Sequence, residues 1–396
     1  MHGDKIPAWD GKEIIYFLFR QKGNDLAKGT FPGPTIRIPR GAIFHAETQG
    51  HGPPPHTIHW HGQEPTPMND GVGHCSMEIG RYTYQFQPNA MGFYFYHCHR
   101  NTVQHFEFGL YGALLIDPPT AYFASQTNPA IPIGQVPSPT TPGAFEFRVQ
   151  ANTTAFPQFP GFLGGDITTK DSLNMTVPYD VEALWVFDDR DSVWSDFAPD
   201  PRAFFPRRGN NPGVNDRWAP GFFNDFNADY WFVTGVDSDP SVIDPGAVAG
   251  PGFMGRIPPD LLIPSGLNSG VGRVIGEAAD RPELQTQISI NAPVGKTVLV
   301  RALNAAYDNV RVTFPFDVVV ISWDGRALGV PPFGNYNRPF VLPGGVSITY
   351  SVARRMEVLF RTTALLIGTQ FATVEFIRNH DGALLHTTLI PITVTA

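Results

Sequence analysis

Short runs of β-branched and aromatic residues, separated by Gly- and Pro-rich turns, constrain the fold of this chain more than any other feature. Glu13–Arg20, Arg81–Gln87 and Gly92–His97 are such runs, and the turn segments GPT, GHGPPP and PNAMG lie between runs of this kind. Arg81–Gln87 (RYTYQFQ) alternates between apolar and polar residues, as a half-buried strand does. Hardly any segment has the 3.6-residue period of a helix. The sequence therefore predicts an all-β protein of the sandwich or barrel type.

The length of the chain favours two domains. A chain of 396 residues exceeds what one hydrophobic core usually organises. We expect a first β domain at residues 1–119, a Pro- and Gly-rich linker at 120–178 and a second β domain at 179–396. The second domain contains a Pro- and Gly-rich insertion at about 240–295.

Charge and hydropathy argue against nucleic-acid binding and against a transmembrane helix. The net charge of −8 argues against nucleic acid, because phosphate binding requires a basic face. No apolar run approaches the roughly eighteen residues of a transmembrane helix. The first residues, MHGDKIPAWDG, contain no apolar signal region, so we expect any export signal to be absent from this sequence.

Histidine is concentrated in two short motifs. The sequence has 12 His, and six of them lie in HTIHWHG, in YHCH and shortly after YHCH. Side chains two apart on a strand share a face, so the strand pair offers two sets of donors. One set is His59, His61, His97 and His99, and the other is His56, Cys98 and His105.

Each set is suited to copper. Two imidazoles and one thiolate match the trigonal His₂Cys site of blue copper, and imidazole is a preferred copper ligand. The alternative, that these are ordinary core or surface histidines, suits an isolated histidine far better than six in this arrangement.

The two motifs resemble those of the multicopper oxidases, the laccase-like cupredoxins. The segments GPTIRI, NDGVGHCSMEIG and FGLYGALLI extend the resemblance through the first domain. In the second domain, FNADYWFVTG and VLVRALNAAYDNVRV are similar to the copper-free middle domain of three-domain members. The resemblance implies two cupredoxin-like Greek-key domains.

The resemblance also implies a role for individual residues. Type 1 copper would be held by His56, Cys98 and His105, with Leu110 at the axial position as a non-ligating residue. Asp70 would match the acidic residue that lines the water path to a trinuclear cluster. The type 2 ligand would be His59, and the type 3 ligands would be His61, His97 and His99.

The chain departs from the family pattern in two ways. Its first domain carries the Cys-containing motif that usually lies in the last domain, as in two-domain oxidases with blue copper in domain 1. A trinuclear cluster takes eight histidines in this family, and this chain supplies four of them. Domain 2 adds only His380 and His386. We therefore expect a homo-oligomer formed through domain 1, or a separate chain with a third cupredoxin domain, to complete the cluster.

These expectations favour a copper enzyme that oxidises a donor one electron at a time and reduces O₂. The donor could be a small molecule, a metal ion or a redox protein, and the location periplasmic or extracellular. Two alternatives remain, a blue-copper electron carrier without a catalytic cluster and a nitrite-reductase-like copper enzyme.

Several other residues are weaker candidates. Buried thiol is the favoured interpretation of Cys75, and a surface position is favoured for His74. We expect little from His45 and His51, which flank the first motif. The acidic residues Asp188, Asp189 and Asp191 are expected at a solvated turn or strand end.

Overall fold

The computed structural model describes residues 2–20, 30–39, 42–50, 56–72, 81–88, 92–100, 102–117, 135–137, 145–147, 180–197, 226–238, 253–256, 274–275, 286–328 and 339–396. Strands are the predominant secondary structure of these residues and helices are few and short, which confirms the all-β prediction. None of their helices is long and apolar enough to cross a membrane. The expected domain limits at 119 and 178 lie outside the described residues and stay a prediction.

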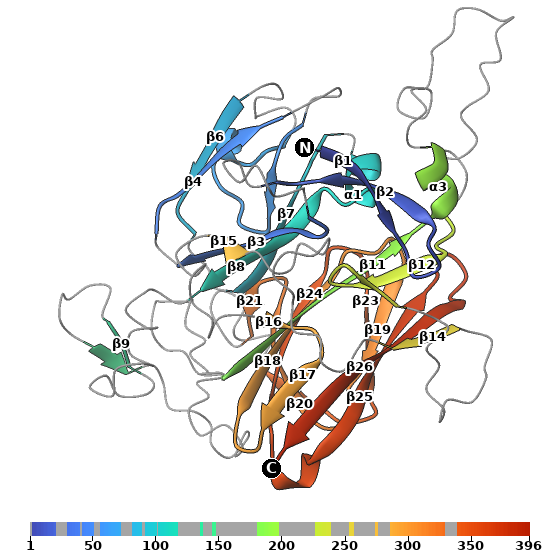
Figure 1. Cartoon of the computed structure of the whole chain (residues 1–396). Helices are drawn as coiled ribbons and strands as arrows, with labels where there is room; N and C mark the ends of the chain where they lie inside the picture. Colours follow the sequence, from blue (N-terminus) through green and yellow to red (C-terminus); the bar gives the residue numbers. More distant parts are fainter. Residues whose placement is uncertain are drawn as a thin grey trace, which may run out of the picture.

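The first domain occupies the blue to cyan part of Figure 1. Its elements are β1 His2–Pro7, β2 Glu13–Leu18, β3 Gly33–Pro39, β4 Phe44–Gln49, β5 His59–His61, the 3-10 helix η1 Pro67–Asn69, β6 Arg81–Phe86, β7 Gly92–His97, α1 Thr102–Glu107 and β8 Tyr111–Asp117. The main sheet has the order β15-β3-β8-β7-β5, in which β15 is Val274–Ile275, and the pairs β1-β2 and β4-β6 flank it. The runs predicted from the sequence form β2, β6 and β7.

The second domain lies below the first in Figure 1 and carries the C-terminus. Its elements are β11 Val181–Arg190, α3 Ser192–Phe197, β12 Tyr230–Val233, β13 Val236–Asp237, β14 Phe253–Arg256, β15 Val274–Ile275, β16 Thr286–Gln287, β17 Ile290–Pro293, β18 Thr297–Asn304, β19 Asn309–Thr313, β20 Val318–Trp323, β21 Arg326–Ala327, β22 Phe340–Leu342, β23 Ser347–Tyr350, β24 Arg355–Arg361, the 3-10 helix η4 Ala364–Leu366, β25 Gly368–Ile377 and β26 Leu384–Thr395. In the sequence that joins the two domains, β9 Gln135–Pro137 pairs with β10 Phe145–Phe147.

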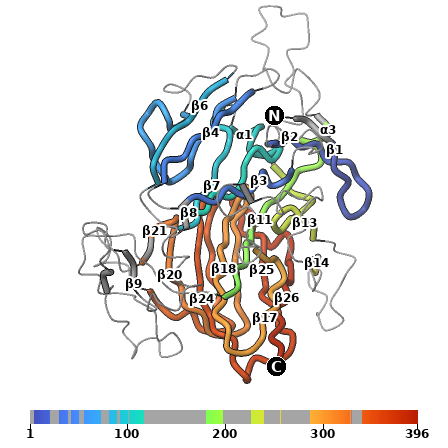
Figure 2. Tube along the Cα trace, turned by 60° about the vertical axis from the view of Figure 1, so that its left-hand side comes forward, coloured from blue at the N-terminus to red at the C-terminus, as the bar shows by residue number. Residues whose placement is uncertain are grey.

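Two sheets form the second domain. The larger has the path β13-β12-β11-β18-β24-β20-β21, and the smaller has the path β14-β26-β25-β19-β23. Figure 2 shows β18, β20 and β24 running alongside β25 and β26 beneath the first domain. The short strand β15 lies within the sequence of the second domain but pairs with β3 of the first domain. The described part of the 240–295 insertion therefore contributes to both domains.

Strand β7 is buried on both of its faces and joins two hydrophobic cores. Tyr94 and Tyr96 point into a core that belongs to the first domain, together with Trp60. The alternate residues Phe93 and Phe95 point into a larger core shared with the second domain. Alternation along a strand explains this division, because successive side chains leave opposite faces. The strand that carries the YHCH motif is thus fixed from both sides.

Candidate metal centre

The histidine motifs meet because β5 and β7 are antiparallel neighbours. His59 lies opposite His97, and Trp60 lies opposite Tyr96. The indole of Trp60 is fully buried and packs edge-on against Phe44 in the core of the first domain. Since neighbouring residues leave opposite faces, burial of this indole turns His59 and His61 to the other side of the sheet.

The first group of donors comprises His56, Cys98 and His105, called the cysteine cluster below. The Cys98 Sγ atom lies 3.1 Å from His105 Nδ1 and 3.7 Å from His56 Nδ1. Both Cys98 and His105 are fully buried. The short helix α1 turns the chain back after the cysteine, and the Cys98 N–H donates to the Leu110 carbonyl at 3.0 Å. Leu110 is buried beside the cluster and offers no donor atom.

The geometry of the cysteine cluster fits a trigonal metal site. Bond lengths of about 2.0 Å to nitrogen and 2.3 Å to sulfur, set at 120°, separate the donor atoms by about 3.7 Å. The two measured separations lie at or below that value, and the three donor atoms lie within 4.8 Å of one another. Burial raises the pKa of the Cys98 thiol, so a bound cation would be needed to stabilise its thiolate.

The second group, called the four-histidine cluster, lies on the opposite face. Ligand atoms of His59, His61 and His97 lie within 4.8 Å of one another, and His61 Nδ1 is 3.2 Å from His97 Nε2. The His99 ring centroid is 5.2 Å from that of His59. The structure thus brings together all four histidines that the strand pattern placed on one face.

Asp70 orients one member of the four-histidine cluster. Its backbone carbonyl lies 2.7 Å from His59 Nδ1, and its carboxylate Oδ1 lies 3.3 Å from the same atom. The ring therefore donates its Nδ1 proton to Asp70 and leaves Nε2 free as a ligand atom. Metal-binding histidines are commonly held in this way.

Burial keeps these imidazoles in the neutral form that binds metals. It lowers the pKa of His97 and of His105 to about 3, and that of His56 to about 4. The pKa of His61 falls to about 2, through burial and then through the positive charge of Arg355. Protons therefore do not compete with a metal ion for these donors near neutral pH.

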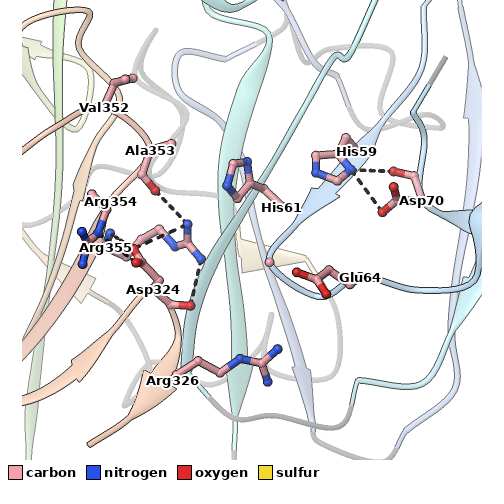
Figure 3. A pocket seen from close by; sticks show the side chains of 11 residues that line it. His59, His61, Glu64, Asp70, Asp324, Arg326, Val352, Ala353, Arg354 and Arg355 are labelled. Carbon is pink, nitrogen blue, oxygen red and sulfur yellow. Dashed lines mark hydrogen bonds and ion pairs between the residues drawn. The ribbon is translucent and has the colours of Figure 1, made fainter. Parts of the chain in front are cut away.

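A cavity of about 450 Å³ opens beside the four-histidine cluster, between the two domains. Figure 3 shows His59 and His61 on one wall and the arginines of the second domain on the other. The four-histidine cluster is therefore accessible from one side, whereas Cys98 and His105 of the cysteine cluster are fully buried. Sequence reasoning missed Arg355, since only the packing of β24 against β7 brings it here.

The remaining candidates lie elsewhere. His45 is exposed on β4, and the sequence positions of His51, His74 and Cys75 lie outside the described residues. In the second domain, the His380 side chain is exposed, whereas His386 is fully buried and donates to or accepts from Ser238 Oγ at 2.8 Å.

The expectation of a solvated acidic turn is wrong. Asp188, Asp189 and Asp191 are all buried. Asp188 pairs with Arg190 at 2.6 Å, and Asp189 accepts the backbone N–H of Tyr307 at 2.9 Å. Asp191 accepts N–H groups at the start of α3. These carboxylates are already bonded to other groups of the protein. No sequence pattern distinguished the three aspartates from surface residues.

Comparisons with known proteins show similarity in sequence to copper proteins over the first domain. The sequence model described as multicopper oxidase matches residues 22–121. The L-ascorbate oxidase of Cucumis sativus is 42% identical over 103 residues, which are 23% of this chain and 16% of that protein. Copper resistance protein A of Pseudomonas syringae pv. tomato is 33% identical over 121 residues, 30% of this chain and 20% of that protein. The match thus spans at most a fifth of these two relatives.

Solved structures resemble the whole chain. The blue copper oxidase from Nitrosomonas europaea aligns with a TM-score of 0.53 at 16% identity, over 99% of this chain and 83% of that one. The multicopper oxidase mgLAC aligns with a TM-score of 0.52 at 17% identity, over 98% and 83%. At such identities the likeness concerns the fold, which is that of cupredoxin-like β-sandwich proteins. In sequence, the likeness to multicopper oxidases lies in the first domain, at residues 22–121.

Proposed function

We propose that this protein is a copper-dependent oxidoreductase that takes single electrons from a donor at a type 1 site and reduces O₂ at a trinuclear site. The cysteine cluster would hold type 1 copper, and the four-histidine cluster would supply half of the ligands of the trinuclear site. Bound copper would supply one-electron redox chemistry at the first site and O₂ reduction at the second.

The observation that carries this proposal is the tripeptide His97-Cys98-His99. Cys98 belongs to the cysteine cluster, and its two covalent neighbours belong to the four-histidine cluster. The peptide bonds on either side of Cys98 thus form a very short covalent path between the cysteine cluster and the four-histidine cluster. This arrangement suits electron transfer from one cluster to the other.

Residues of the chain would assist in two further ways. Asp70 holds His59 and lines the cavity, where its carboxyl group would relay protons toward the four-histidine cluster. Leu110, which is buried and has no donor atom in its side chain, would be the residue that leaves the type 1 site without a fourth ligand. A type 1 site without a fourth ligand would have a raised redox potential.

We further propose that a second copy of the chain completes the trinuclear site. Two four-histidine clusters facing each other across a two-fold axis would give the eight histidines of a full cluster, and two-fold contacts are the commonest in homo-oligomers. A separate chain with a third cupredoxin domain is the alternative source. A periplasmic or extracellular location, expected from the resemblance, belongs to the same proposal.

Copper content measured together with the mass of the assembly tests this function. The shared cluster predicts about five coppers per pair of chains, two of type 1 and three between the chains. One copper in a monomer would instead favour an electron carrier, and two per chain would favour the nitrite-reductase-like alternative. A paired assembly that lacks the intense visible band of blue copper would contradict the assignment of the cysteine cluster.

A further inference from the structure

The cavity beside the four-histidine cluster has a buried arginine in its wall. The Arg355 side chain is only 3% exposed, and its guanidinium stacks over Phe95 at 5.3 Å from the ring centroid. Its approach to the first domain is so close that a Cβ atom on Gly62, which has φ of +87°, would lie 2.6 Å from Arg355 Nη2. The arginine is therefore held rigidly at the boundary between the domains.

No carboxylate makes a close ion pair with Arg355 among the described residues. Its guanidinium donates to the carbonyls of Phe93 at 3.3 Å, Ala353 at 2.7 Å and Asp324 at 2.9 Å. The nearest carboxylate oxygen of Asp324 is 3.9 Å away, and Asp324 pairs instead with Arg354 at 2.8 Å. A guanidinium has five N–H donors, so two remain for another acceptor. A buried charge normally has a counter-charge, and here the cavity offers the space for one.

A second arginine, Arg326, lines the same cavity. Arg326 is exposed, and within the described ranges no carboxylate lies at ion-pair distance from it. The loop that carries it is fixed to the first domain, because Tyr94 donates its hydroxyl to the Gly325 carbonyl at 2.7 Å. Figure 3 shows Arg326 and Arg355 on the same side of the cavity.

The opposite wall carries Asp70 and Glu64. Asp70 faces His59 at 3.3 Å, so its charge is directed toward the histidines and away from the arginines. Glu64 is exposed and forms no ion pair with either arginine in the part of the chain that is described. The carboxylates of this wall therefore leave the charges of Arg326 and Arg355 available.

We propose that this cavity binds a carboxylate, with Arg355 and Arg326 as its donors and His61 beside it. The planar guanidinium matches a carboxylate with two parallel hydrogen bonds, and the volume of about 450 Å³ admits a small organic acid. The carboxylate would bridge the two domains at the open side of the four-histidine cluster. It comes either from a free small acid or from an Asp or Glu side chain of a second copy of the chain.

Acetate binding to the copper-free full-length protein tests this proposal. At constant ionic strength, acetate should bind saturably and raise the midpoint of thermal unfolding. Arg326→Gln should weaken acetate binding about tenfold, the effect of losing one charge-assisted hydrogen bond of about 1.4 kcal/mol. Arg378→Gln is the control, because Arg378 pairs with Asp381 on a distant hairpin and does not line the cavity.

Two further measurements complete the test. Arg355→Lys keeps the charge without the planar fork and should also weaken acetate binding; if this variant does not fold, Arg326→Gln still decides. Competition between acetate and self-association, measured as assembly mass, would identify the second copy as the source, and its absence would identify a free acid. Absence of saturable binding, or equal binding by Arg326→Gln and Arg378→Gln, would overturn the proposal. The assay needs no copper, so such a failure leaves the proposed copper function standing.

Discussion

The two domains are built from the same kind of β-sandwich but use histidine in opposite ways. In the first domain, six histidines and Cys98 bring their ligand atoms together around β5 and β7. In the second domain, His386 stacks on Trp231 with ring centroids 4.5 Å apart, and His380 lies exposed on a hairpin.

The difference shows that histidines in this fold form a metal site only where their ligand atoms converge and are not bonded to other protein groups. His386 lies near the start of β26, but it is enclosed in the interior packing of the second domain. A partner chain cannot reach a fully buried imidazole that is already bonded to Ser238. An assembly completed by His386 of a neighbouring copy is therefore excluded by its burial.

The largest expected effect comes from Cys98→Ser in the first domain. The variant should lose the visible charge-transfer band, about one copper per chain and all donor oxidation, because the hydroxyl does not replace a thiolate ligand. Absorption spectra and copper analysis measure this. The exposed His45→Gln on β4 serves as the control and should keep all three properties. A Cys98→Ser protein that retains the band would refute the cysteine cluster as a blue-copper site.

His61→Gln should distinguish the contribution of the four-histidine cluster from that of the cysteine cluster. We expect O₂ consumption to disappear, while the visible band persists because the cysteine cluster contains none of the altered atoms. Oxygen-electrode measurements and absorption spectra on the same sample give both readouts. Loss of the band together with O₂ consumption would mean that the clusters form a single site.

The sequence specified the donor sets better than their surroundings. The spacing in HTIHWHG and YHCH was sufficient to predict which donor residues share a face of the strand pair, because side chains alternate along any strand. Three features depend on long-range packing and left no local pattern: the return of the chain through α1, the burial of Asp188 beside Tyr111, and the insertion of Arg355 between the domains.

A smaller effect, on stability alone, is expected from Glu182→Gln. Glu182 is buried and accepts from Arg37 of the first domain and from Arg301 of the second, each at 2.5 Å. Burial opposes its ionisation, but the two arginines lower its pKa overall. Breaking such a buried pair should cost about 3–5 kcal/mol in the free energy of unfolding. Urea denaturation measures this loss.

The control for this variant is Glu13→Gln, whose ion pair with Lys5 is exposed and should contribute less than about 1 kcal/mol. The wild-type contribution of Glu182 should be present above the ordinary Glu pKa and decline as the pH falls below it. Equal losses in the two variants would show that the Arg37–Glu182 contact does not join the domains.

The smallest effect concerns the buried histidine of the second domain. Burial lowers the pKa of His386 to about 3, so the unfolded chain takes up a proton near pH 6.5 that the folded chain cannot accept. Folded stability should therefore decrease as the pH falls from about 6.5 to 3. His386→Leu should flatten that part of the pH profile in urea denaturation, and His380→Gln should not. An unchanged slope in His386→Leu would contradict the structural role of His386.

The burial of β7 on both faces has a consequence for the evolution of the chain. One side of this strand completes the core of its own domain, and the other completes a core to which Trp185 and Val300 of the second domain contribute. Exchange of either domain for a homologous one would leave Phe93 and Phe95 facing an unmatched surface. The two sandwiches are therefore expected to be inherited as a single unit and to denature in one cooperative transition.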